Sequence, residues 1–240
     1  MKFDQTSEIR QQLLKEMKTG IFSEMDRLPR EIVLAEHYGI SRNHLRDILA
    51  QLESEGFITR RHGVGTIINH HVLDVAIRMD IETEFMDIIR QSGYEPEISR
   101  ISMLEEVADP FIAEKLNIPV GTEVVRIIRV CTADGKPAIY CDDVIKKSLI
   151  KRDFMMNDLR TPIFCFLQNF CDIDAYMDLT QFHAILADEH LAKVLDIPVG
   201  TPLLNLEEVD YDIDGNVVFY SKQFFCDIIL NQTVMRKKLY

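Results

Sequence analysis

The stretch SRNHLRDILAQLESEGFITRRHGVGTIIN, residues 41–69, decides the fold of the first part of this chain. Four of its apolar residues have the i, i+3, i+4, i+7 spacing of a helix with one buried side: Leu45, Ile48, Leu49 and Leu52. Ser41 is a favoured residue at a helix start, so the helix is predicted to begin there and to end near Ser54. Residues 57–61 then alternate like a strand, a glycine turn follows at 62–65, and residues 66–69 form a return strand.

Two further helices are predicted upstream of this stretch. Ile9, Leu13 and Met17 recur every fourth residue over 7–19, and a short helix is expected over 31–37, after the break at Pro29. Three helices closed by a small hairpin predict a winged helix-turn-helix domain over residues 1–69.

The polar side of the third predicted helix suits DNA. Arg42 and Arg46 are four residues apart and share a solvent-facing side, with Asn43 and His44 in the first turns. Arginine can pair bidentately with guanine and asparagine with adenine in a major groove. The alternative is a solvated polar face without a ligand. The glycine hairpin, basic at residues 60–62, favours the DNA interpretation because a flexible backbone can approach a minor groove closely.

The charge of the chain is distributed unevenly. The 240 residues carry a net charge of -12, yet residues 1–70 hold ten basic and ten acidic side chains. Residues 71–240 hold 17 basic and 29 acidic ones. Such asymmetry predicts two modules with different partners, of which only the first tolerates nucleic acid. The five cysteines form no C-x-x-C pair and are expected to be free thiols.

The second part of the chain contains an internal repeat. LNIPVGT at 116–122 recurs as LDIPVGT at 195–201, with six of seven residues identical. Each copy follows a predicted helix, at 111–116 and 188–195. Each precedes two strands joined by an Asp-Gly turn, at 123–133 with 137–145 and at 203–211 with 217–226. A helix-plus-hairpin unit repeated twice predicts an α+β domain with an antiparallel sheet; a further helix is expected over 81–92.

These residues resemble the GntR family of bacterial transcriptional regulators. The resembling pieces are LPREIVLA at 28–35, GISRNHLRD at 39–47, LESEGFI at 52–58 and RHGVGT at 61–66. The chain departs from the family pattern at Arg30, usually serine, at Ile32, usually arginine, and at His44, usually threonine. The resemblance implies DNA contacts at Arg30, Ser41, Arg42, Asn43, His44, Arg46, Arg61, His62 and Gly63.

Residues 80–236 resemble the UTRA ligand-sensing domain of HutC-type GntR regulators, which has the chorismate lyase fold. The resembling residues include AEKL at 113–116, PVGT at 119–122, Arg129 and ADGKP at 133–137. Cys131, Cys141 and Phe219 stand where the family has Arg, Glu and Glu, which implies a less charged effector pocket. The resemblance implies effector contacts at Arg129, Tyr140, Asp142, Thr161, Tyr220 and Ser221.

The expected protein is therefore a cytoplasmic, homodimeric DNA-binding regulator, a repressor modulated by a small molecule. Its domains are predicted at 1–69 and 80–240 with a linker at 70–79. Its partners are pseudo-palindromic operator DNA and a sugar, sugar phosphate, nucleoside or related metabolite. No catalytic residue, cofactor, metal site or membrane partner is expected, since the sequence contains none of the usual enzyme motifs. The alternative is a stand-alone metabolite-binding protein or enzyme on a chorismate-lyase-like fold.

Overall fold

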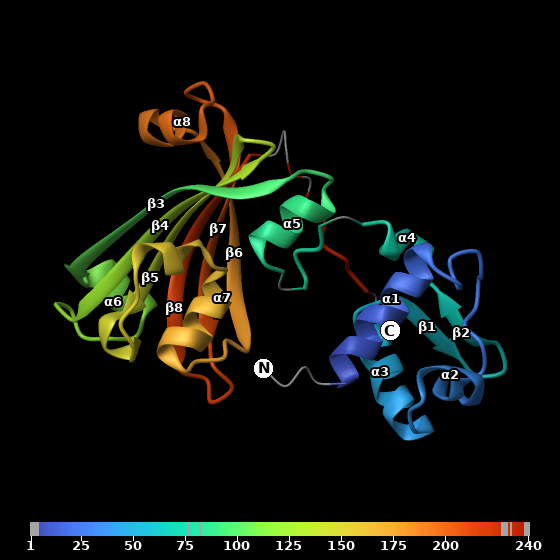
Figure 1. Ribbon diagram of the computed structural model, residues 1–240. Helices are drawn as coiled ribbons and strands as arrows, with labels where there is room; N and C mark the ends of the chain where they lie inside the picture. The colour runs from blue at the N-terminus through green and yellow to red at the C-terminus, as the bar shows by residue number, and fades with distance from the viewer. Residues whose placement is uncertain (1–4, 76, 82, 227–229, 231, 238–240) are drawn as a thin grey trace. The chain divides into compact units, whose positions relative to one another are not determined.

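The computed structural model describes residues 5–75, 77–81, 83–226, 230 and 232–237, and the chain forms two compact units, Met1–Ile81 and Glu82–Tyr240 (Figure 1). The division falls after Ile81, whereas a linker was expected over residues 70–79. The short helix α4, His70–Leu73, occupies the beginning of that stretch. It belongs to the first unit because Leu73 packs into the core of that unit.

The first unit is three helices closed by a two-stranded hairpin. The helices are α1 (Gln5–Thr19), α2 (Glu31–Tyr38) and α3 (Arg42–Ser54), and the antiparallel strands are β1 (Ile58–Arg61) and β2 (Gly65–Ile68). The four apolar residues predicted to face the core from α3 are fully buried. They pack with Leu13, Met17 and Leu34 from the other two helices. The winged helix-turn-helix predicted from residues 41–69 is confirmed.

The second unit is built on a six-stranded antiparallel sheet with the order β3-β4-β5-β8-β7-β6. Its strands are β3 (Pro96–Val107), β4 (Glu123–Ala133), β5 (Lys136–Lys146), β6 (Met177–Leu186), β7 (Pro202–Tyr211) and β8 (Val217–Phe225). The four hairpin strands were predicted within one residue of these bounds. The edge strands β3 and β6 were not predicted. Among the described helices, none has the length and apolar character needed to cross a membrane.

The sequence repeat is also a structural repeat. Each copy runs strand, helix, hairpin: β3, α6 (Pro110–Lys115), β4 and β5 in the first, and β6, α8 (Glu189–Leu195), β7 and β8 in the second. The turn after each helix has the same hydrogen bonds, from Gly121 to Ala108 and from Gly200 to Ala187, both 2.8 Å long. The single differing position, Asn117 or Asp196, has a left-handed backbone in both copies. Asn and Asp are the non-glycine residues that best tolerate that conformation.

The two faces of the sheet are covered by different helices. Helices α6 and α8 pack on one face. Helix α6 contacts Val124, Val144 and Tyr220. Helix α8 contacts Val130, Tyr140 and Leu203. The other face packs against η2 (Met156–Arg160), α7 (Ile163–Phe166) and η3 (Leu167–Cys171), through residues such as Val125, Ile127 and Phe219. The remaining helical segments of this unit are α5 (Phe85–Gln91), where a helix over 81–92 was expected, and η1 (Lys147–Leu149).

Candidate nucleic-acid interface and effector site

Helix α3 presents two arginines to solvent. Ser41 caps the helix by accepting a hydrogen bond from the His44 amide at 3.2 Å. The Arg42 and Arg46 side chains are 66% and 59% exposed, and their Nε atoms lie 3.1 and 4.0 Å from the same Glu31 oxygen. Glu31 is the first residue of α2. Its carboxylate pairs with both guanidinium groups, which therefore lie on the same side of α2 and α3. Asn43 is exposed beside them.

The hairpin lies next to this arginine-bearing surface. A groove of about 610 Å³ is lined by residues from the α1–α2 connection, the start of α3 and the wing; its charged members are Arg27, Arg30, Glu31, Arg42 and Arg61. Gly63 and Gly65 also line it and have positive φ angles of 76° and 107°, which glycine adopts without strain. Four arginines against one glutamate make this groove strongly cationic.

Two residues differ from the sequence-based expectation here. The ring Nε2 of His44 lies 2.9 Å from Thr6 Oγ1 of α1 and the side chain is half-buried, so His44 points away from the groove. The contact predicted for it is not supported by this position, whereas His62 is exposed at the wing as expected. Arg27 was missed: its Nη1 donates to the Val64 carbonyl at 3.2 Å and it lines the groove. The sequence signal that could have identified Arg27 was its position directly before the Leu28–Pro29 motif.

A buried ion pair lies on the α7 face of the sheet. Arg129 Nη2 is 2.7 Å from Asp143 Oδ2, and the Ser221 hydroxyl donates to Asp143 Oδ1 at 2.7 Å. These three residues are 3%, 1% and 0% exposed. Arg129 also donates to the Thr161 carbonyl at 3.1 Å, while the Thr161 hydroxyl donates to Asp158. The Nε of Arg129 has no hydrogen-bond partner among the described residues.

Carboxylates surround this pair. Gln223 donates to Glu208, and Thr180 donates to Glu208 at 3.3 Å. Burial, followed by the charge of Asp178, raises the pKa of Glu208 to about 8. Burial also raises the pKa of Glu84 to about 7, although the charge of Arg129 opposes that rise. The guanidinium of Arg129, already paired with Asp143, therefore lies on the same face as several acidic groups.

Three of the predicted effector residues lie on the opposite face of the sheet. Tyr140 packs with α8, Tyr220 packs with α6, and Asp142 accepts a hydrogen bond from Arg126 at 2.6 Å. These three residues do not share the face of Arg129, because successive residues of a strand point to opposite faces. That alternation was visible in the sequence: Asp143 rather than Asp142, and Ser221 rather than Tyr220, share the face of Arg129.

The raised pKa of Glu208 predicts a pH dependence of stability. An unfolded glutamate titrates near 4.3, so between about pH 4.3 and 8 the folded protein binds more protons than the unfolded chain. The free energy of unfolding is therefore expected to fall as pH rises through this window. Glu208→Gln keeps the acceptor for Gln223 and should make that fall shallower, as measured by denaturant unfolding at pH 5, 6.5 and 8. Identical slopes for the two proteins would contradict this.

Comparisons with known proteins agree with this architecture. The family described as "Bacterial regulatory proteins, gntR family" matches residues 5–68, and the UTRA domain family matches residues 91–226. The Escherichia coli K12 protein named "Probable fructoselysine utilization operon transcriptional repressor" is 25% identical over 216 residues, 90% of this chain and 88% of that one. The "Histidine utilization repressor" of Pseudomonas aeruginosa is 25% identical over 198 residues, 82% and 77% of the two chains.

Solved structures show the same fold. YydK from Bacillus subtilis superposes with a TM-score of 0.79 at 18% identity, covering 98% of this chain and 100% of that one. PhnF from Mycobacterium smegmatis superposes with a TM-score of 0.58 at 20% identity, covering 95% and 99%. At 18% and 20% sequence identity, this similarity shows that the helices and strands are arranged in the same fold.

Proposed function

We propose that this chain, which belongs to the UTRA-domain branch of the bacterial GntR family of DNA-binding transcriptional regulators, is a homodimeric repressor controlled by a small molecule. The relatives described above are named as repressors. Helix α3 enters a major groove and the β1–β2 wing enters the adjacent minor groove. A two-fold dimer then contacts a pseudo-palindromic operator. Effector bound beside Arg129 favours a dimer geometry whose two DNA-binding units no longer match the operator.

The cationic groove carries the DNA part of this proposal. It combines Arg30 and Arg42 with wing residues Arg61 and Gly63, all named from the sequence as DNA contacts. The test is selection of tight-binding duplexes from a random-sequence library by the full-length protein, followed by titration with the selected operator. A pseudo-palindromic consensus is expected. Failure to enrich any duplex at low salt would refute the function.

The wing is expected to contribute one phosphate contact. Binding to duplex DNA weakens with salt by a slope of about -0.9 in log K against log salt for each phosphate neutralised. Arg61→Gln should therefore make this slope about one unit shallower and weaken all duplexes similarly. Arg90, exposed on α5, gives a matched control as Arg90→Gln. An unchanged slope for Arg61→Gln contradicts the phosphate contact.

The effector is proposed to carry hydroxyl groups and an amine rather than a phosphate. Arg129 is already neutralised by Asp143, which leaves Glu84 and Glu208 as acidic groups on this face. Ser221 and Gln223 add hydroxyl and amide groups. The unpartnered Nε of Arg129 supplies a donor for a ligand oxygen. Fructoselysine, named for the Escherichia coli relative, has this combination of hydroxyls and amine.

Thermal-shift measurements test this ligand class. Fructoselysine and glucosamine are expected to raise the melting temperature of the full-length protein more than glucosamine 6-phosphate, since a ligand that binds the folded state stabilises it. Ser221→Ala should reduce the shift. Greater stabilisation by the phosphate would contradict the charge argument, and an unchanged shift in Ser221→Ala would contradict the location.

The dimer has a candidate surface at one sheet edge. Strand β6 is an edge strand, and Met177, Leu179, Phe182 and Leu186 on it are 48–67% exposed. Unpaired edges with exposed apolar side chains readily pair with another chain. A second copy of this protein is the proposed occupant, and Leu179→Lys is expected to shift the molar mass measured by light scattering toward the monomer. A dimer that persists in this variant contradicts the placement at β6.

A further inference from the structure

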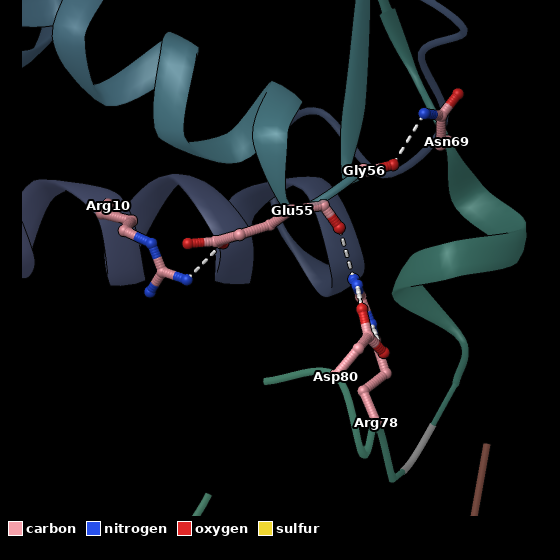
Figure 2. Close-up of polar contacts among 6 residues, drawn as sticks. All are labelled: Arg10, Glu55, Gly56, Asn69, Arg78 and Asp80. Carbon is pink, nitrogen blue, oxygen red and sulfur yellow. Dashed lines mark hydrogen bonds and ion pairs between the residues drawn. The ribbon is translucent and has the colours of Figure 1, made fainter. Parts of the chain in front are cut away.

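Arg78 is a buried cation near the end of the first unit. Its side chain is 7% exposed and forms an ion pair with Asp80, whose Oδ1 lies 3.2 Å from Arg78 Nε. Its Nη1 donates to the Glu55 carbonyl at 2.6 Å, and its guanidinium lies 5.0 Å from the centre of the Phe57 ring. We call these four residues the Arg78 anchor; Figure 2 shows its polar contacts.

The anchor holds the C-terminal end of α3, the helix proposed to contact bases. Glu55 is the residue directly after α3, and its carboxylate pairs with Arg10 of α1. The next carbonyl, of Gly56, accepts a hydrogen bond from Asn69 at 2.7 Å (Figure 2). Cations are favoured at helix C-termini, where carbonyl groups lack partners within the helix. The side chains of Asn69 and Arg78 both follow the wing in the sequence. They therefore attach the last part of the first unit to the end of α3.

The anchor shortens the free chain between the two units. Only residues 82–84 separate Ile81 from α5, which begins at Phe85, and three residues span at most about 10–11 Å. Ile77 is itself buried, 2% exposed, so residues 78–84 are the ones that the anchor restrains. Seven flexible residues reach up to about 23–25 Å, with a root-mean-square span of about 13–16 Å. One turn of DNA measures about 34–36 Å, so the loosened chain at full extension could bridge more than half a turn.

We propose that Arg78 is a specificity-determining residue for operator binding: by fixing residues 77–81 to the end of α3, it sets the half-site spacing that the dimer accepts. The proposal rests on the dimeric DNA-binding function above. Arg78 touches no base in this scheme and acts by positioning. Its loss leaves recognition of one half-site intact and removes discrimination between spacings.

The test compares full-length wild type and Arg78→Gln on selected operator duplexes. The half-sites are separated by the selected spacing, by 5 additional base pairs, or by 10, and a single half-site duplex is included. Wild type is expected to bind the 5-base-pair insertion at least 20-fold more weakly than the selected spacing. Arg78→Gln should show less than a threefold difference, with single half-site affinity within twofold of wild type. Amide hydrogen exchange at residues 77–81 should be at least tenfold faster in the variant.

Two further variants complete the experiment. Arg90→Gln removes an exposed arginine and should retain the spacing preference of wild type. Asp80→Asn weakens the ion pair but leaves the Glu55 bond, so an intermediate preference is expected. It is the deciding variant if Arg78→Gln lacks a cooperative unfolding transition, and a wild-type preference in Asp80→Asn would then overturn the proposal.

The outcomes separate this proposal from the function on which it rests. Wild-type spacing discrimination in a folded Arg78→Gln overturns the anchor proposal alone. A tenfold loss of single half-site affinity in that variant also overturns it, because Arg78 would then only support α3. A wild-type protein that selects no duplex overturns the DNA-binding function itself, and the anchor proposal with it.

Discussion

Replacing Arg42 by alanine is expected to lower the affinity of the full-length protein for its selected operator about 5- to 150-fold. An arginine that pairs bidentately with a base contributes about 1–3 kcal/mol, and Arg42 is 66% exposed at the first turn of α3. Its partner Glu31 keeps a second arginine, Arg46, at 4.0 Å, so the local structure survives the substitution. The measurement is a fluorescence anisotropy titration.

Non-operator DNA distinguishes base contact from phosphate contact in this experiment. If Arg42 contacts a base, Arg42→Ala loses affinity for the operator but little for a duplex of unrelated sequence. Equal losses on both duplexes would assign Arg42 to a phosphate. Unchanged operator affinity would remove Arg42 from the interface, and Arg90→Ala serves as the control for loss of one exposed arginine.

Replacing Asp143 by alanine is expected to lower the free energy of unfolding of the second unit by about 3–5 kcal/mol. The substitution leaves the guanidinium of Arg129, 3% exposed, without its carboxylate, and an uncompensated buried charge is strongly destabilising. It also removes the acceptor of the Ser221 hydroxyl. Urea denaturation followed by circular dichroism measures the effect.

The neighbouring residue supplies a matched control. Asp142 lies on the opposite face, more exposed than Asp143, and its partner Arg126 also pairs with Glu106. Asp142→Ala is therefore expected to cost less, about 1 kcal/mol or below. The double variant Arg129→Met, Asp143→Leu should recover much of the stability, since replacing both members of a buried pair by apolar residues is often neutral. Equal losses for the two single variants would contradict the importance of burial at Asp143.

The sequence predicted the elements whose residues are strongly buried on one side. The spacing of Leu45, Ile48, Leu49 and Leu52 located α3, and the repeated LNIPVGT motif with its Asp-Gly turns located both central hairpins. The edge strands β3 and β6 escaped prediction. Ile98 is the one buried residue of β3, and β6 has none, so the alternation of apolar residues that marks a strand is weak in both.

The candidate site residues also separate into those that belong to local motifs and those whose position depends on the tertiary structure. Arg42, Arg61 and Gly63 belong to local motifs, and the structure places them in one groove; their contact with DNA is a prediction. His44 was named as a DNA contact, whereas in the structure its ring lies against Thr6, a residue 38 positions away. Tyr140, Asp142 and Tyr220 were named together with Arg129 as effector contacts, and strand alternation places them on the opposite face of the sheet.

By itself, the sequence determined the winged helix-turn-helix, the repeated hairpins and the family, because helix periodicity, turn residues and motif spacing are properties of neighbouring positions. Tertiary structure alone decided that Asp143 neutralises Arg129, that Ser221 joins them from 78 residues away, and that Arg78 holds the end of α3 across 23 residues. Those contacts form because a buried charge is stable only beside a partner, and folding selects that partner from anywhere along the chain.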